Sequence, residues 1–326
     1  MTVEASSGRW RGRTRATPAL RARRRRDVVR TVAFLSPWLI GTGLFFIYPL
    51  ITTAWLSFSH YDGFTSPTWV GLTNWHYVFT AYPFFWPAMR NTLWFVVVLV
   101  TARVVAGLAL GMLVLKIKRG STVLRTLFYA PFLAPPVAGT LAFVFLLNPG
   151  TGAVNQLLAT LGLPQPGWFT SPAWSKPALT LLALWGVGDL MVIFMASLLD
   201  VPRELYEAAE LDGAGAINRF RHVTLPHLRP IIGFAVITGV IATMQYYTQP
   251  LVAGQVASGQ IGGSGQQVEP GYPDGSTLTL PQLVYNLGFQ RFDIGSACVV
   301  AMVLFVFSMA FAAFLMRRRS GFMGED

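Results

Sequence analysis

The sequence is poor in charge, lysine and cysteine, and each shortage excludes a class of protein. Only 12% of the 326 residues are charged while 53% are hydrophobic, which leaves too little polar surface for a soluble globule of this size. The single cysteine, Cys298, excludes an intramolecular disulfide framework and a cysteine-built zinc site. Because no lysine lies in a Gly-x-x-x-x-Gly-Lys loop and the histidines lack metal-ligand spacing, we predict no cofactor or metal in this chain and no ATP site of the P-loop kind.

The sequence contains several long apolar runs. A helix needs about 20 apolar residues to cross the ~30 Å hydrocarbon core of a bilayer, and in lipid it satisfies its own backbone hydrogen bonds. Six runs meet that length, at 32–58, 91–115, 124–147, 177–199, 230–253 and 294–316. The predicted fold class is therefore all-α, a polytopic integral membrane protein with six transmembrane helices.

The distribution of Lys and Arg predicts the orientation, because basic residues are retained on the cytoplasmic side. Most of them lie in the 1–31 tail, the 116–125 loop, the 200–229 loop and the segment after the last span. With an even number of spans, both termini are predicted to be cytoplasmic. The tail 1–31 is predicted to be disordered, and residues 319–326 form the predicted cytoplasmic C-terminus.

The Arg-rich tail carries most of the net charge of +11. Nucleic-acid binding is one explanation of such charge, but no nucleic-acid-binding fold is predicted, and topology and anionic headgroups explain a basic run beside a span. The tail also resembles the basic end of a signal peptide. The apolar run after Thr31 is longer than the roughly 7–15 residues of a signal peptide and has no small-residue cleavage site, so we interpret it as a retained span.

A polar, acid-bearing segment, 200–229, separates the fourth and fifth predicted spans. Pro202 suits the first turn of a helix and Gly213 suits the left-handed residue after one, which predicts a short helix over about 203–211. Three acids of this helix share one face: Glu204, Glu207 and Glu210. An amphipathic helix on the headgroups is the alternative, but carboxylates suit an anionic lipid surface poorly. A protein partner with a complementary groove explains them better.

Motifs in and around this segment resemble a known family. Glu207-Ala208-Ala209, then Gly213, then Leu225-Pro226, with Val223 where isoleucine is usual, is similar to the EAA loop of binding-protein-dependent ABC importer permeases. Other strings are similar to the carbohydrate-uptake branch, the permeases of the maltose and glycerol-3-phosphate importers. These strings are Val70-Gly71-Leu72-x-Asn74-Trp75, Arg125-Thr126-Leu127-Phe128-Tyr129-x-Pro131 and Asn148-Pro149-Gly150-x-Gly152-x-Val154-Asn155. The resemblance covers residues 30 to 318.

The resemblance implies the type I ABC importer permease fold over residues 32–318 and a defined set of partners. These are a second homologous permease, a dimer of ABC ATPases that bind ATP and Mg, and an extracytoplasmic substrate-binding protein. It implies a transport subunit of the bacterial plasma (inner) membrane that is not an enzyme and imports a carbohydrate or related polar solute. The implied ATPase-coupling residues are Glu204, Glu207, Ala208, Ala209, Asp212, Gly213, Leu225 and Pro226.

Polar and ionisable groups within spans are candidates for the solute pathway, because burying them in lipid is expensive. Asp189 is one such group, although an aspartate near the outer interface would simply be reached by water. Thr238, Ala242 and Gln245 are spaced to share a helix face and match family positions that contact sugar, but Ala242 replaces a polar residue of the maltose permease. With aromatic Phe132 and the string before Asp189, the candidate set is Phe132, Trp185, Gly186, Asp189, Thr238, Ala242 and Gln245. Plain packing or lipid contact is the alternative for the rings.

The predicted outer loops differ in composition. Loops 59–90 and 148–176 are rich in Trp and Tyr, which indicates interfacial anchoring, and we expect them to contribute to docking of the binding protein. Loop 254–280 replaces a short glycine-proline turn of the relatives with a Gly-, Ser-, Gln- and Pro-rich stretch, which predicts flexibility; a docking loop is the alternative.

Two other classes of membrane protein explain the sequence less well. A secondary transporter would need no acidic cytoplasmic hairpin, and the chain has no obvious internal repeat and only Arg103 and Asp189 as charges within spans. A membrane-embedded enzyme would need a nucleophile, a metal cluster or paired acids at one depth, and the sequence presents none of these.

Overall fold

The computed structural model describes residues 18–117, 119–259 and 270–319, and these are almost entirely helical. They divide into two compact units, residues 1–52 and 53–326. The first unit contains α1 (Pro18–Thr42), a π-helical turn η1 (Gly43–Ile47) and the start of α2 (Tyr48–Leu56). The predicted disorder of 1–31 is wrong from Pro18 onward, because the arginines of this run have good helix propensity and continue the helix of the apolar segment. Residues 1–17 lie outside the described residues.

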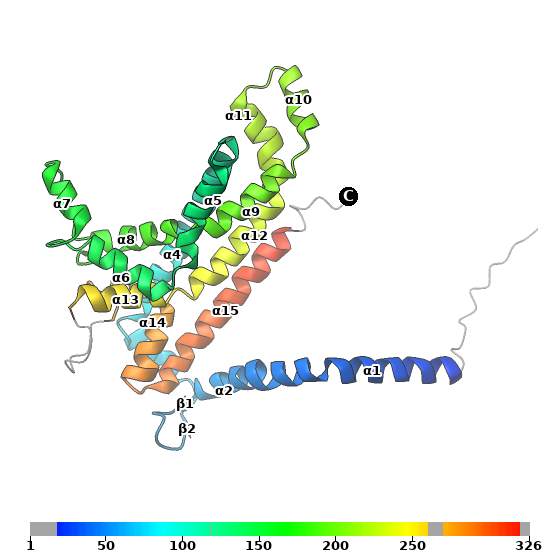
Figure 1. Cartoon of the computed structure of the whole chain (residues 1–326). Helices are drawn as coiled ribbons and strands as arrows, with labels where there is room; N and C mark the ends of the chain where they lie inside the picture. The colour runs from blue at the N-terminus through cyan, green and yellow to red at the C-terminus, as the bar shows by residue number, and fades with distance from the viewer. Residues whose placement is uncertain (1–17, 118, 260–269, 320–326) are drawn as a thin grey trace, which may run out of the picture. The chain divides into compact units, whose positions relative to one another are not determined.

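The second unit is a helical assembly with one two-stranded antiparallel ribbon (Figure 1). The ribbon and the short helices after it are β1 (Ser59–His60), β2 (Thr68–Trp69), α3 (Thr73–His76) and η2 (Tyr77–Ala81). The middle of the chain forms α4 (Phe85–Lys116), α5 (Ser121–Tyr129), η3 (Ala130–Leu133), α6 (Pro136–Leu146), α7 (Ala153–Thr160), α8 (Pro172–Trp185) and α9 (Gly188–Leu199). The remainder forms α10 (Arg203–Leu211), α11 (Ala216–Arg219), η4 (Phe220–Thr224), α12 (Leu225–Met244), α13 (Thr248–Ala257), α14 (Leu280–Tyr285), η5 (Asn286–Gln290) and α15 (Ile294–Arg319).

Four continuous helical segments of the described chain are long and apolar enough to cross a membrane: Val29–Leu56, Phe85–Lys116, Ala216–Met244 and Ile294–Phe314. Two further predicted spans are broken helices. Ser121–Leu133 and Pro136–Leu146 meet at a bend of 100°, and Pro172–Trp185 and Gly188–Leu199 at a bend of 50°. The described chain thus has four candidate spans, and six if each bent pair is one span.

The breaks have local causes that hydropathy does not detect. Pro135 and Pro136 lack the backbone N–H that would continue a helix and disfavour helical geometry in the residue before them. The predicted fifth span, 230–253, ends too late, because the helical segment that contains its start, Ala216–Met244, ends at Met244. The apolar residues after Gln245 belong to α13, a separate helix.

Helix α4 is the central element of the second unit and packs against α8, α9 and α12. Its buried residues Phe95 and Leu99 join a cluster with α8, while Val96 and Val100 pack against α12. It approaches α9 closely at Gly107, where an added Cβ would lie 2.7 Å from Leu190 Cβ. Small residues of this kind let two membrane helices pack backbone to backbone.

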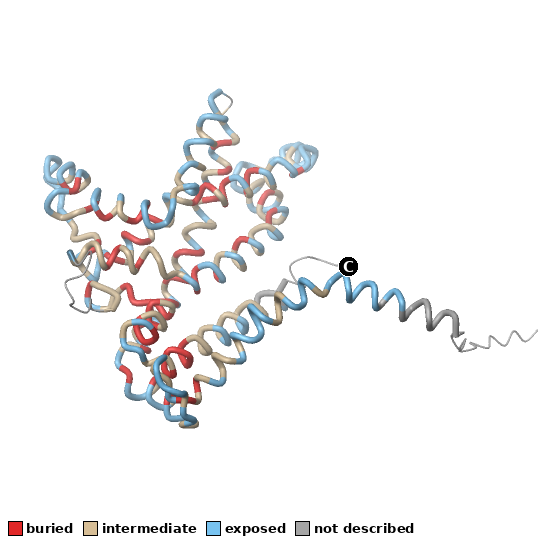
Figure 2. The backbone as a smooth tube through the Cα atoms, turned by 60° about the horizontal axis from the view of Figure 1, so that its bottom comes forward, coloured by how far each residue is buried: buried red, intermediate tan, exposed pale blue. Residues whose placement is uncertain are grey.

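The 254–280 segment is more ordered than its composition predicts. Residues 254–257 belong to α13, and residues 270–280 pack into a core with α4, α14 and α15 in which Leu278 and Leu280 are fully buried. Asn91 on α4 donates to the carbonyls of Gly275 and Leu278 at 2.9 and 3.0 Å. Two buried leucines therefore override the flexible composition of this part, and residues 260–269 lie outside the described residues. Figure 2 shows the buried residues of the described chain in red and the exposed ones in pale blue.

Candidate functional site

Two separate regions contain the predicted functional residues, and the first is the hairpin formed by α10, α11 and η4. Helix α10 begins after Pro202 and ends before Gly213, which has φ +78°, as the sequence predicts. The backbone N–H groups of Gly213 and Ala214 donate to the carbonyls of Glu210 and Ala209 at 3.0 and 2.9 Å. This arrangement satisfies carbonyls at the end of the helix. The hairpin lies at one end of α9 and α12, and α13 lies at the other end of α12 (Figure 1).

Two contacts hold the hairpin together. Tyr206 Oη and Thr224 Oγ1 share a hydrogen bond of 2.8 Å, which joins α10 to η4. Arg219 Nη1 donates to Glu210 Oε2 at 2.9 Å. Glu210 is therefore engaged within the chain, while Glu204 and Glu207 are exposed without an ion pair in the described structure.

The exposed surface of the hairpin is apolar as well as acidic. Leu205, Leu211 and Ile217 are 48%, 90% and 81% exposed, and exposed large apolar groups next to fixed charges are typical of protein interfaces. The sequence argument predicted the acids and missed these apolar groups, although their position beside the acids is visible in the sequence. Of the other predicted coupling residues, Ala208, Asp212 and Gly213 are exposed, whereas Ala209, Leu225 and Pro226 are half-buried.

The second region is a cavity of about 460 Å³ between α4, α6, α8 and the junction of α12 with α13. Five of the seven predicted pathway residues line it: Phe132, Trp185, Gly186, Ala242 and Gln245. The structure adds polar and aromatic groups that sequence reasoning missed: Arg103, Thr243, Tyr246, Tyr247, Thr248 and Gln249. A mixture of rings with a few hydrogen-bonding groups is the usual lining of a small-molecule site.

A second cavity of about 140 Å³ adjoins the first. Asp189, Thr238 and Ala242 line it, and Arg103, Ala242 and Thr243 line both cavities. Each of the seven predicted pathway residues thus lines one or both of these adjoining cavities. One geometric premise was wrong: Gln245 is the residue after the end of α12, so only Thr238 and Ala242 belong to the helix proper.

An ion pair joins the walls of the two cavities. Arg103 Nη2 on α4 lies 2.9 Å from both carboxylate oxygens of Asp189, at the start of α9. Each side chain is 27% exposed. Arg103 and Asp189, the two charged residues within the predicted spans, are therefore an ion pair. The N-terminus of α9 also stabilises the Asp189 carboxylate. A sequence alone offers no signal for a contact between residues 86 positions apart.

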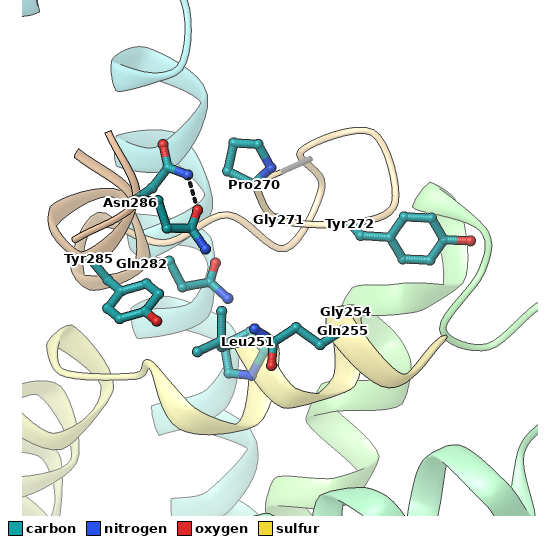
Figure 3. A pocket seen from close by; sticks show the side chains of 11 residues that line it. Leu251, Gly254, Gln255, Pro270, Gly271, Tyr272, Gln282, Tyr285 and Asn286 are labelled. Carbon is teal, nitrogen blue, oxygen red and sulfur yellow. Dashed lines mark hydrogen bonds between the residues drawn. The ribbon is translucent and has the colours of Figure 1, made fainter. Parts of the chain in front are cut away.

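A third, much smaller pocket of about 30 Å³ lies between α13, α14 and the segment that begins at Pro270. Figure 3 shows Gln282, Tyr285 and Asn286 on one side of it and Leu251 and Gln255 on another. The volume suits a water molecule rather than a solute. Within the described residues, no group of three or more His, Cys, Asp or Glu side chains is placed to hold a metal ion.

Comparisons with known proteins agree on one family. A family model described as the binding-protein-dependent transport system inner membrane component matches residues 103–321. The chain is 30% identical to a probable ABC transporter permease protein, YesP, of Bacillus subtilis, over 86% of this chain and 87% of the relative. It is also 30% identical to the lactose transport system permease protein LacF of Rhizobium radiobacter, over 87% of this chain and 93% of that protein.

A solved structure has the same fold. The chain superposes with a TM-score of 0.69 on a chain of a bacterial ABC transporter involved in the import of the acidic polysaccharide alginate. The match has 23% sequence identity and covers 92% of this chain and 99% of that chain. A second structure contains the bacterial alginate ABC transporter with a pentasaccharide-bound periplasmic protein, and the TM-score to it is 0.71 at 20% identity.

Proposed function

We propose a function from one premise: the chain belongs to the family of binding-protein-dependent transport system inner membrane components, the multi-pass permease subunits of ABC importers. In this family ATP hydrolysis is performed by separate ATPase subunits. On that premise, the chain imports a carbohydrate or a related hydroxyl-rich solute. The observation that carries the choice of solute is the cavity of about 460 Å³, whose rings and amides suit sugar faces and hydroxyl groups.

The relatives support the same class of solute. One relative is named for lactose transport and another, SmoG of Agrobacterium fabrum, for sulfoquinovosyl glycerol transport. In this chain, Phe132 and Trp185 would face sugar rings, while Gln245 and Gln249 would bind hydroxyl groups. Asp189 and Thr238 would line the smaller continuation of the pathway.

The hairpin is the surface we assign to the ATPase. Its exposed Glu204 and Glu207 would meet basic groups of a partner, and Leu205 and Leu211 would fill an apolar groove beside them. Asp212 and Gly213 form the turn behind the helix, and Leu225-Pro226 begins the long helix α12 toward the cavity. Motion of the hairpin would thus reach the cavity wall through α12, as a shift between two packed arrangements.

The assembly would contain a second permease, a dimer of ATPases that bind ATP and Mg, and a substrate-binding protein. The loop 148–176 is a candidate dock for that last partner because it is held in a defined shape: Asn155 Nδ2 donates to the Pro166 carbonyl at 3.0 Å, and Trp168 Nε1 donates to Asn155 Oδ1 at 2.9 Å. The hairpin and both termini would face the cytoplasm, in accord with the basic residues of those segments.

Reconstitution tests this function. The permease pair, the ATPases and the binding protein are placed in liposomes, and uptake of radiolabelled lactose and related neutral sugars is measured with and without ATP. We expect uptake of at least one sugar only with ATP and with all subunits present. Uptake that runs on an ion gradient without the ATPases would contradict the proposal.

A further inference from the structure

The ion pair of Arg103 with Asp189 leaves part of the guanidinium unused. Both short contacts come from Nη2, so the arginine does not use the two-nitrogen fork that it usually presents to a carboxylate. Arg103 Nε is buried and has no hydrogen-bond partner among the described residues. A buried donor without a partner costs free energy, so an acceptor that reaches this guanidinium would be favoured.

A second unsatisfied group belongs to another side chain that lines this cavity. Tyr246 Oη is also buried without a partner among the described residues, and Arg103 and Tyr246 both line the cavity of about 460 Å³. Two side chains of one cavity therefore carry a donor that nothing in the described structure satisfies. Both groups can donate a hydrogen bond, so their common requirement is an acceptor oxygen.

The charges around the cavity favour a neutral ligand over an acidic one. Of the described residues that line this cavity, Arg103 alone carries a charge, and Asp189 on the adjoining cavity already compensates it. A solute carboxylate or phosphate would therefore add an unbalanced negative charge to a poorly solvated site, which is unfavourable. A hydroxyl oxygen accepts the same hydrogen bonds without that cost.

We propose that Arg103 and Tyr246 form a donor site that selects neutral, hydroxyl-rich sugars over acidic ones. Asp189 is the positioning residue: it orients the guanidinium and cancels its charge. This inference rests on the proposed import of carbohydrates and names two contacts within the same site. Arg103 was absent from the residues predicted for the pathway, and Tyr246 was absent as well.

Direct binding to the assembled permease and ATPase complex tests the selection. The complex is placed in nanodiscs without the binding protein, so that this protein does not filter the ligands. Lactose as the neutral probe and galacturonate as the acidic probe are titrated by saturation-transfer NMR. We expect the unsubstituted complex to bind lactose about tenfold more tightly than galacturonate, because the acidic probe adds an uncompensated charge near Asp189.

Three variants separate the roles. Arg103→Lys keeps a cation beside Asp189 but loses the fork of donors, and Tyr246→Phe keeps the ring but loses the hydroxyl; each should weaken lactose binding about five- to tenfold. Asp189→Asn should reverse the preference toward galacturonate by about tenfold or more. The matched control is Tyr285→Phe, whose ring lines the 30 Å³ pocket; it should leave both affinities within about twofold. Co-purification of all subunits shows that each variant is assembled.

The outcomes distinguish this inference from the proposed function. Lactose binding that is unchanged in Arg103→Lys and Tyr246→Phe, or a lactose to galacturonate ratio that is unchanged in Asp189→Asn, overturns the donor site while the sugar pathway stands. An unsubstituted complex that binds neither sugar overturns both. If Asp189→Asn does not assemble, Arg103→Lys and Tyr246→Phe still test whether the donor site exists.

Discussion

The hairpin that we assign to the ATPase and the cavity that we assign to the solute are built on opposite principles. The hairpin is a single stretch of chain, residues 203–224, whose parts are joined by the Tyr206–Thr224 hydrogen bond and the Arg219–Glu210 ion pair, and it is exposed over most of its surface. The cavity is assembled from four separate segments of the second unit. The hairpin surface is thus encoded locally, whereas the cavity requires the packed bundle. Substitutions should therefore act differently in the two places: on assembly in the hairpin, and on solute recognition in the cavity.

The largest effect is expected from Glu207→Lys. The exposed carboxylate becomes a cation that faces the basic groups expected on the ATPase, and like charges at an interface cost several kcal/mol. Uptake should fall by about 100-fold or more, and the ATPase should no longer co-purify. A membrane-fraction blot checks that the permease is still inserted. Normal uptake in this variant would remove the distinction between an assembly surface and a recognition site.

Gly213→Val should act on the same surface through the backbone. Gly213 has φ +78°, a conformation that costs other residues about 1–2 kcal/mol and a β-branched residue more. The turn after α10 should move, and uptake should fall about tenfold with weaker ATPase co-purification. Gly233→Val is the control, because a Cβ at Gly233 meets nothing within 4 Å and its φ is not positive. Equal effects of the two would show that the turn has no special role.

Trp185→Ala tests the cavity, where we expect a substitution to affect solute recognition and not assembly. The ring lines the larger cavity and is 42% exposed, and an aromatic contact is worth about 0.5–1.5 kcal/mol beyond its buried area. Sugar uptake should fall about three- to tenfold while the ATPase still co-purifies. Phe145→Ala removes another exposed ring, on α6, that does not line this cavity, and it should change uptake less. Loss of the ATPase from Trp185→Ala would contradict the division of roles.

The smallest effect is expected from Glu210→Gln. Its partner in the ion pair is Arg219, and the Glu210 side chain is 70% exposed, so water screens the pair and its worth is about 1 kcal/mol or less. Uptake should change by less than about twofold. A loss as large as that of Glu207→Lys would mean that Glu210, and not only its neighbours, meets the ATPase.

Hydropathy did not predict the shape of the helices within the apolar runs. It located the apolar runs, but the prolines after Tyr129 divide the third span and Gly186 with its neighbours divides the fourth. The end of the fifth span was placed nine residues too late because apolar residues continue past the break at Gln245. Mean hydropathy over a window does not register where a single backbone donor is missing or where a chain turns.

The sequence by itself determined the membrane environment, the acidic hairpin and its helix, because these depend on composition, local spacing and single residues such as Pro202 and Gly213. It also named the pathway candidates on α12 and around Asp189. Only the tertiary structure decided that these candidates share two adjoining cavities, that Arg103 pairs with Asp189 and that Leu278 orders part of a glycine-rich segment. The physical reason is that cavities, ion pairs and buried cores are contacts between residues distant along the chain, and local patterns carry no record of which distant residues will meet.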